Sequence, residues 1–177
     1  VEATRAIAPF DGIYATHLRN ECAGIFDSLE ETFRIGREAG VRVEISHIKL
    51  SAPVVWGRAA DVLEAIARAR AAGLVITHDQ YAYTASSTGL RQVIPEWAME
   101  GGSTRFAERL DVATQLACIV ADMRRRLERD GAPDYSYVTL ATCRADRSLD
   151  GMRLADAARA RRGSDSLDSQ IEMILDI

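Results

Sequence analysis

The sequence lacks the features that mark several classes of protein. No apolar run approaches the roughly 18 residues of a membrane span, and no charged amino-terminal segment precedes an apolar core, as in a signal peptide. Basic residues are not in excess, because 22 Lys and Arg stand against 26 Asp and Glu. The basic surface that neutralises phosphates in nucleic-acid-binding proteins is therefore missing. We expect a cytoplasmic protein with neither membrane nor nucleic acid as a partner.

Cysteine and histidine are scarce, with three residues of each. Cys22, Cys118 and Cys143 are far apart and form no C-x-x-C pair, which argues against a disulfide framework or a zinc ribbon. We expect reduced thiols, mostly buried. The rest of the composition, with 47% hydrophobic and 27% charged residues, is that of an ordinary globular domain.

The two ends of the sequence indicate an internal piece of a longer protein. The chain starts without methionine, and it stops within an apolar helical pattern that carries no capping residue. It contains no low-complexity linker. We therefore expect residues 1–177 to form part of one domain.

Strand and helix patterns alternate over the first half of the chain. Strands are predicted at 12–17, 41–48 and 74–84, and helices at 27–40 and 57–73, each helix ending at a glycine. A capping box from Ser28 to Glu31 is expected to start the first helix. The side chains expected to face inward are Ile25, Leu29, Phe33 and Gly36 in the first helix and Val62, Leu63, Ile66 and Ala67 in the second. Single helices between strands predict parallel βαβ units, and the fold class is α/β.

The alternation of strand and helix patterns ends after residue 84. Residues 85–105 are rich in Ser, Thr, Gly and Pro and predict a long loop, which in a compact domain is usually functional or mobile. A helix is predicted at 104–129, a strand at 135–143, and further helices at 154–162 and 165–177. Residues 11–84 thus carry the strands, and residues 85–177 form a loop and a mostly helical insertion.

The three histidines lie at or near the ends of predicted strands. In parallel α/β folds the carboxyl ends of the strands form the functional edge. The 30 residues from His17 to His47 match one βα unit, so both are expected on adjacent strands at the same edge, where two neutral imidazoles suit a divalent metal such as zinc. The spacing is equally compatible with separate hydrogen-bonded histidines at strand ends.

Four ordered motifs carry a resemblance to a known family. They are "GIYATHLRNE", "ISHIKLSAPVVWGRAADVLEAIARARAAG", "THDQYAYTASSTGL" and "VIPEWAMEGG". Together they resemble the N-acyl-D-amino-acid deacylase (D-aminoacylase) family of the amidohydrolase superfamily. The resemblance implies a (β/α)8 barrel of which strands five to seven are present. It also implies zinc-dependent hydrolysis of an N-acyl-D-amino acid to a free D-amino acid and a carboxylate.

The resemblance also implies roles for individual residues. The metal ligands of the family fall on His17 and His47, and one or two zinc ions are expected. The groups that bind the carboxylate of the substrate fall on Lys49, Tyr81, Ser87 and Arg91. The remaining ligands of the family, an H-x-H pair and a cysteine, and its aspartate general base have no counterpart in the segment. We therefore expect no catalytic base within residues 1–177 and no activity from these residues alone.

Some residues near the motifs are interpreted as structural. Cys22 is taken as a buried or half-exposed thiol and His78 as a structural histidine. Asp79 is expected to make a contact either with the backbone or with a residue that lines the site, and Asp165 is taken as a helix cap. Ala82 stands where the family usually has proline. Two alternatives remain open: another amidohydrolase, of the cyclic-amide (dihydroorotase) type, and a non-catalytic half-barrel that serves as a binding module. The acyl group, the side-chain preference and the oligomeric state are left open.

Overall fold

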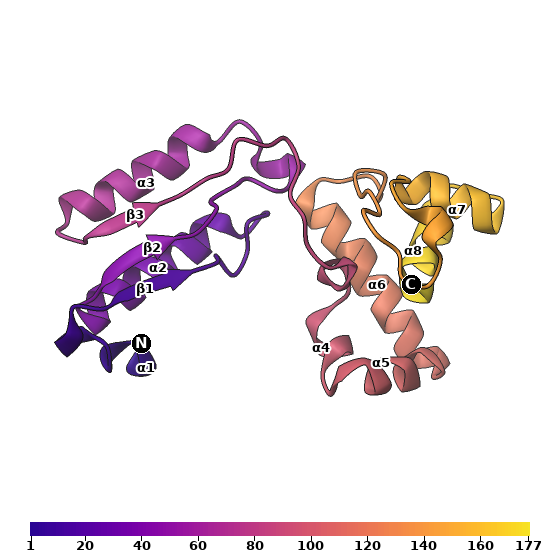
Figure 1. The fold of residues 1–177 in the computed structure, drawn as a ribbon, viewed down its shortest axis with the longest axis horizontal. Helices are drawn as coiled ribbons and strands as arrows, with labels where there is room; N and C mark the ends of the chain where they lie inside the picture. Colours follow the sequence, from indigo (N-terminus) through magenta and orange to yellow (C-terminus); the bar gives the residue numbers. More distant parts are fainter. The chain divides into compact units, whose positions relative to one another are not determined.

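A computed structural model describes residues 1–177 and divides them into two compact units, Val1–Ser86 and Ser87–Ile177. The first unit contains the sheet, and the second is mostly helical (Figure 1). The assignment of both units to one partial barrel domain stays a prediction. None of the helices combines the length and apolarity that crossing a bilayer requires.

The first unit is a three-stranded parallel sheet in the order β1-β2-β3. Its elements are α1 (Glu2–Arg5), η1 (Ala8–Phe10), β1 (Ile13–Thr16), α2 (Ile25–Ala39), β2 (Arg42–Ile45), η2 (Pro53–Val55), α3 (Ala59–Ala71) and β3 (Ile76–His78). One long helix lies between each pair of successive strands (Figure 1). The register pairs Thr16 with Ile45 and Ile45 with His78, so the three strands end at the same level. The prediction of parallel βαβ units, and with it the α/β class, is confirmed.

Helices α2 and α3 share one apolar core with one face of the sheet. The buried residues of this core include Ile25, Leu29 and Phe33 of α2, Val62 and Ile66 of α3, and Val43, Ile45 and Ile76 of the strands. Gly36 also faces inward, and Gly40 ends α2 with a left-handed φ of 68°, as the sequence predicted. The other face of the sheet is open, with Ile13 50% and Val75 61% exposed.

Three details of the first unit differ from the predictions. The predicted capping box is wrong, because α2 begins at Ile25 and Ser28 lies inside the helix. Just before the helix, the side-chain oxygen of Asn20 accepts hydrogen bonds from the amides of Cys22 and Gly24. Leu63 is exposed, as is Ala67, so only the other two predicted positions of α3 are buried.

Strand β3 is much shorter than predicted. It pairs only with β2, and the β2 chain turns away after Ile45, so residues beyond Asp79 find no partner for a ladder. The continuation as far as residue 84 is wrong for that reason.

The second unit packs its helices around α6. Its elements are η3 (Leu90–Val93), α4 (Glu96–Met99), α5 (Gly102–Leu110), α6 (Ala113–Asp130), η4 (Arg147–Leu149), α7 (Leu154–Arg162) and α8 (Leu167–Asp176). Ile119, Met123 and Leu127 of α6 are buried against α7 and α8 residues such as Leu154 and Ile171. The spacing of four residues places the three α6 side chains on one face.

Buried polar groups in the second unit are paired. Gln170 is 1% exposed; its side-chain oxygen accepts from the amide of Tyr135, and its nitrogen donates to the carbonyl of Asp165. The buried Tyr135 hydroxyl donates to the carbonyl of Met123 at 3.2 Å. Burial raises the pKa of this hydroxyl well above its ordinary range. The phenol is therefore a permanent donor that links the 132–135 segment to α6.

Three predictions for the second unit are wrong. The helix expected at 104–129 is interrupted where Val112 adopts an extended backbone, which lets Phe106 and Leu110 of α5 pack on the core of α6. The strand expected at 135–143 is reduced to one antiparallel bridge, Thr139 with Arg153. Asp165 is not the helix cap: Ser166 accepts from the amide of Ser169, whereas the Asp165 carboxylate pairs with Arg159.

The cysteines form no disulfide. Only Cys143 is buried; Cys22 is half-buried, and Cys118 on α6 is exposed. The expectation of mostly buried thiols is therefore wrong, because Cys118 lies on a face of α6 that no other element covers.

Candidate functional site

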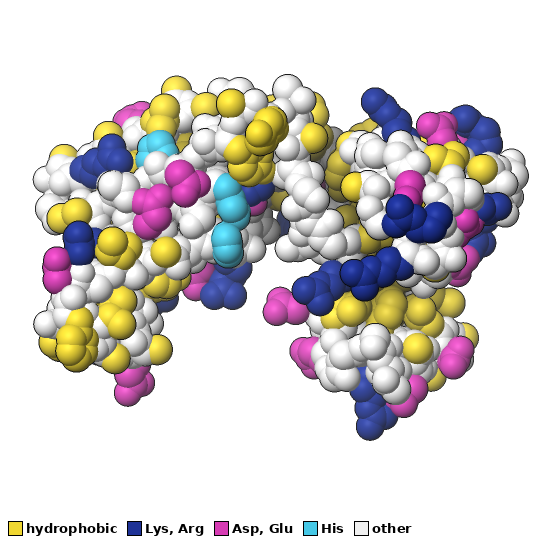
Figure 2. Space-filling view, in the orientation of Figure 1, with side chains coloured by type: hydrophobic (Ala, Val, Ile, Leu, Met, Phe, Trp, Pro, Cys, Tyr) yellow, Lys and Arg dark blue, Asp and Glu magenta, His cyan; other side chains and the backbone are white.

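The carboxyl ends of the strands bring His17 and His47 together. His17 directly follows β1, and His47 lies two residues beyond β2. Their rings stack with centroids 4.4 Å apart and planes 13° from parallel. His17 Nδ1 lies 2.5 Å from His47 Nε2, so one nitrogen of each ring faces the other. A stacked pair of histidines is visible on the surface of the first unit in Figure 2.

An unusual turn presents the His47 side chain. His47 has φ +43°, in the left-handed region that residues other than glycine seldom adopt, although histidine does so more often than most. Asp79 makes two hydrogen bonds to this turn. Its carboxylate accepts from the amide of His47 at 2.5 Å, and its carbonyl accepts from the amide of Ile48 at 3.0 Å. Of the two contacts expected for Asp79, the structure shows the one with the backbone. Strained backbone that neighbours hold in place is characteristic of functional sites.

A partly buried ion pair stands beside His47. Lys49 Nζ lies 2.5 Å from one carboxylate oxygen of Glu21 and 2.6 Å from the other. It also lies 2.9 Å from His47 Nδ1. The Glu21 side chain is 16% exposed and that of Lys49 20%. Because β2 ends at Ile45, the turn after the strand brings Lys49 and His47 together.

Tyr81 borders the same group. Its ring centroid lies 6.5 Å from that of His47, and the Lys49 ammonium is 5.9 Å from the centre of the phenol ring. Four of the six predicted site residues thus gather in the first unit. Ser87 and Arg91 belong to the second unit, where both are exposed and Arg91 lies in η3.

Glu21 is the member of this cluster that sequence reasoning missed. It lies in the loop after β1, four residues beyond His17, and the amide of Ser51 donates to its carbonyl at 2.8 Å. The available signal was its position: a carboxylate in the loop of one βα unit, facing a lysine in the equivalent loop of the next. His78 ends β3 and joins neither the histidine stack nor the ion pair.

The donor set fits half of a zinc site. Imidazole nitrogens are ordinary zinc ligands, and those of His17 and His47 meet at an exposed edge. No third His, Cys, Asp or Glu joins them as a group able to hold a metal ion.

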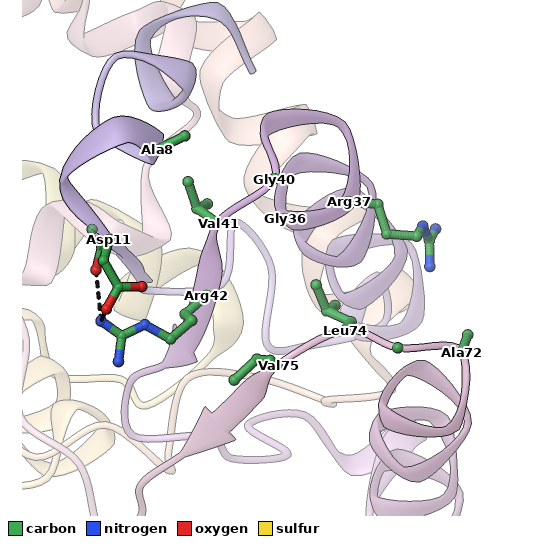
Figure 3. A pocket seen from close by; sticks show the side chains of 12 residues that line it. Ala8, Asp11, Gly36, Arg37, Gly40, Val41, Arg42, Ala72, Leu74 and Val75 are labelled. Atoms are coloured by element: carbon green, nitrogen blue, oxygen red, sulfur yellow. Dashed lines mark hydrogen bonds and ion pairs between the residues drawn. The ribbon is translucent and has the colours of Figure 1, made fainter.

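The open pocket of the first unit lies at the opposite edge of the sheet. It is lined at the amino ends of the strands by residues that include Asp11, Gly36, Gly40, Arg42 and Leu74 (Figure 3). Arg42 donates there to the Asp11 carboxylate at 3.0 Å and to its carbonyl at 2.6 Å. Because parallel α/β folds place their chemistry at the carboxyl ends, the histidine edge is the candidate site.

Comparison with known proteins identifies relatives of the segment. No family model matches the chain. It is 46% identical over 92 residues to a D-aminoacylase of Alcaligenes xylosoxydans xylosoxydans, covering 52% of the chain and 19% of that protein. It is 38% identical over 142 residues to an N-acyl-D-glutamate deacylase of the same organism, covering 72% of the chain and 28% of that protein. The chain thus spans less than a third of the relatives it matches.

Solved structures agree with these relatives. A crystal structure of D-aminoacylase, described as defining a novel subset of amidohydrolases, matches 96% of the chain and 27% of its own length, with TM-score 0.60 and 30% identity. The N-acyl-D-glutamate deacylase of Bordetella bronchiseptica, solved with zinc and a phosphonate mimic of the tetrahedral intermediate, matches 96% of the chain and 28% of its own length, with TM-score 0.62 and 25% identity. The resemblance indicated by the motifs is therefore confirmed: over this segment the chain is similar in sequence and fold to the N-acyl-D-amino-acid deacylases, which are metal-dependent amidohydrolases.

Proposed function

We propose that the chain is a segment of a zinc-dependent amidohydrolase that cleaves N-acyl-D-amino acids into a D-amino acid and a carboxylate. The complete fold would be a (β/α)8 barrel in which β1, β2 and β3 are strands five to seven. The relatives support this proposal through their names and their similarity to the chain. Within the chain, the supporting observation is the meeting of His17 Nδ1 and His47 Nε2 at the carboxyl edge of adjacent parallel strands.

In this proposal, some residues of the segment bind the metal and others bind the substrate. His17 and His47 would hold one zinc ion together with ligands from other strands, and a second ion is compatible with the proposal. When bound, zinc polarises the amide carbonyl and activates water for attack. Lys49 and Tyr81 border the histidines and would face the substrate α-carboxylate, with Ser87 and Arg91 completing its binding. A fixed position for that carboxylate, relative to the metal, selects one hand of the amino acid.

The test uses the full-length protein that carries this segment. We expect stoichiometric zinc and hydrolysis of an N-acetyl-D-amino acid, with the L-enantiomer as the control substrate. His47→Ala should abolish both zinc binding and turnover. A His47→Ala variant that keeps both zinc and turnover would contradict the proposal.

Two further substrates separate the alternatives. Hydrolysis of a dihydropyrimidine-type cyclic amide in place of the acyl amino acid would identify an amidohydrolase of the cyclic-amide type. Tight binding of an N-acyl-D-amino acid without turnover of either substrate would identify a binding module.

A further inference from the structure

A carboxylate beside the candidate site holds the ammonium of Lys49 at one point. Lys49 Nζ lies 2.5 Å from Glu21 Oε2 and 2.6 Å from Glu21 Oε1, and it donates to the carbonyl of His47 at 3.1 Å. These oxygens converge on a single nitrogen, which suits the compact charge of an ammonium rather than a planar guanidinium. Lys49 is also the only lysine among the 22 Lys and Arg residues of the sequence.

Glu21 is itself fixed in its loop. Its carbonyl accepts from the amide of Ser51 at 2.8 Å, which joins the loop after β1 to the loop after β2. Its side chain is only 16% exposed, so the surrounding residues limit its movement. Tyr81 adds a weaker cation–π contact, with the ammonium 5.9 Å from the centre of its ring. Glu21 is therefore the main anchor of the Lys49 ammonium.

We propose that Glu21 is a positioning residue that acts on the substrate through Lys49. The inference rests on the proposed function, in which Lys49 binds the α-carboxylate of an N-acyl-D-amino acid. A free lysine side chain has many rotamers, and ordering it during binding lowers the affinity. The ion pair with Glu21 orders Lys49 before the substrate arrives. The carboxylate then meets an ammonium that has a fixed place beside His47.

Glu21 also has an effect of the opposite sign, because its negative charge partly compensates that of Lys49. Removal of Glu21 would end this compensation, but it would also leave a side chain that is 20% exposed with an unpaired charge. An unpaired charge at a partly buried site is unfavourable, and a flexible lysine avoids it by extending its ammonium into solvent. The ammonium would then leave the site altogether. We therefore expect weaker, not stronger, binding of the substrate without Glu21.

The kinetic test uses the full-length protein and two substrates, an N-acetyl-D-amino acid and the same compound with a carboxamide in place of its carboxylate. In Glu21→Ala we expect KM for the acid to rise about 10-fold, within the factor of about 30 that corresponds to the full rotamer entropy of a lysine. The change in kcat, and in KM for the carboxamide, should be much smaller. Glu21→Gln should recover part of the loss, since its amide oxygen can still accept. Glu31→Ala, which removes the ion pair with Arg19, is the matched control and should bind both substrates normally.

A double-mutant cycle shows whether Glu21 acts through Lys49. In the Lys49→Met background, Glu21→Ala should have little further effect on KM, because the side chain that it positions is gone. An equal effect in both backgrounds would overturn the proposal, and so would a lower KM for the acid in Glu21→Ala. Zinc content is measured for every variant. Its loss in Glu21→Ala would also overturn the proposal, since the effect would then arise at His47.

A measurement without turnover tests the positioning itself. Because Lys49 is the only lysine of residues 1–177, peptide mapping identifies its reductive methylation. We expect slow methylation of Lys49 in the wild type and in Glu31→Ala, and clearly faster methylation in Glu21→Ala, where the ammonium reaches solvent. Equal rates in all three proteins would show that Glu21 does not hold Lys49. A wild type that shows the difference but hydrolyses no N-acyl-D-amino acid would refute the proposed function and leave the anchoring of Lys49 by Glu21 in place.

Discussion

At the residue scale, the two cations proposed for the substrate carboxylate have different surroundings. Lys49 is held by Glu21 and His47 at 20% side-chain exposure, whereas Arg91 is exposed in η3. A guanidinium without a fixed partner is able to form two parallel hydrogen bonds with a carboxylate. Under the proposed function, we therefore expect both cations to bind the substrate carboxylate, Lys49 from a rigid position and Arg91 from an exposed one.

Arg91→Met should impair binding of the carboxylate and leave zinc content unchanged. We expect kcat/KM on an N-acetyl-D-amino acid to fall by the equivalent of about 2 to 4 kcal/mol, the scale of a lost charged hydrogen-bond pair. Lys49→Met should behave similarly. The informative comparison is the same amide without its carboxylate: an equal loss on both substrates would show that Arg91 does not bind that group.

Asp79 should matter through the backbone of His47. Asp79→Ala removes the acceptor that holds the His47 amide, and one hydrogen bond of this kind contributes about 1 kcal/mol. Amide hydrogen exchange of residues 46–50 should accelerate about fivefold in the full-length variant. Asp79→Asn keeps a side-chain oxygen and should exchange almost as slowly as the wild type. Unchanged amide exchange rates in Asp79→Ala would mean that the turn after β2 keeps its shape without this hydrogen bond.

At the element scale, the contact of α2 with the sheet depends on Gly36. A Cβ atom there would lie 2.5 Å from Val43 Cγ2 and 2.9 Å from Leu74 Cδ1, closer than packing allows. The missing side chain is what lets α2 approach β2, although glycine within a helix costs roughly 1 kcal/mol relative to alanine.

Gly36→Ala should therefore destabilise the protein despite the higher helix propensity of alanine. We expect a net loss of about 1 to 3 kcal/mol, the cost of an overpacked core. The measurement is the thermal unfolding midpoint of the full-length protein. A second change, Val43→Ala, removes the closest clashing group, so the double variant should regain part of the lost stability. A Gly36→Ala unfolding midpoint at or above that of the wild type would show that the core accommodates the methyl group.

At the scale of the whole molecule, the sheet of the first unit is covered on only one side. Ile13 and Val75 are exposed on its other face, and both edge strands have one open edge. Apolar faces and unpaired edges promote association between chains. In a closed barrel the same face would be the interior.

The 177 residues expressed alone should accordingly associate. We expect concentration-dependent aggregates in light scattering and strong binding of a hydrophobic dye, with weak, substoichiometric zinc, because two histidines supply half of a tetrahedral site. A cooperative, monomeric thermal transition with tight one-to-one zinc binding would contradict both the half-barrel proposal and the incomplete ligand set.

The sequence by itself determined the periodic parts of this protein. Alternating patterns and glycine stops fixed three parallel strands, the positions of α2 and α3, and the inward set that includes Leu29 and Phe33, because burial of one helical face is a local, repeating requirement. The spacing of 30 residues further predicted that His17 and His47 lie at the ends of neighbouring strands.

Tertiary structure decided what depends on contacts between distant residues. In the left-handed turn of His47, the amide donates to the carboxylate of Asp79, 32 residues away, and Glu21 pairs with Lys49 across 28 residues of chain. The break at Val112 and the loss of the 135–143 strand likewise follow from packing on α6 and from the lack of a partner strand. Hydrogen bonds and ion pairs of this kind leave no periodic trace in a sequence, since each depends on a single pair of atoms that only the folded chain brings together.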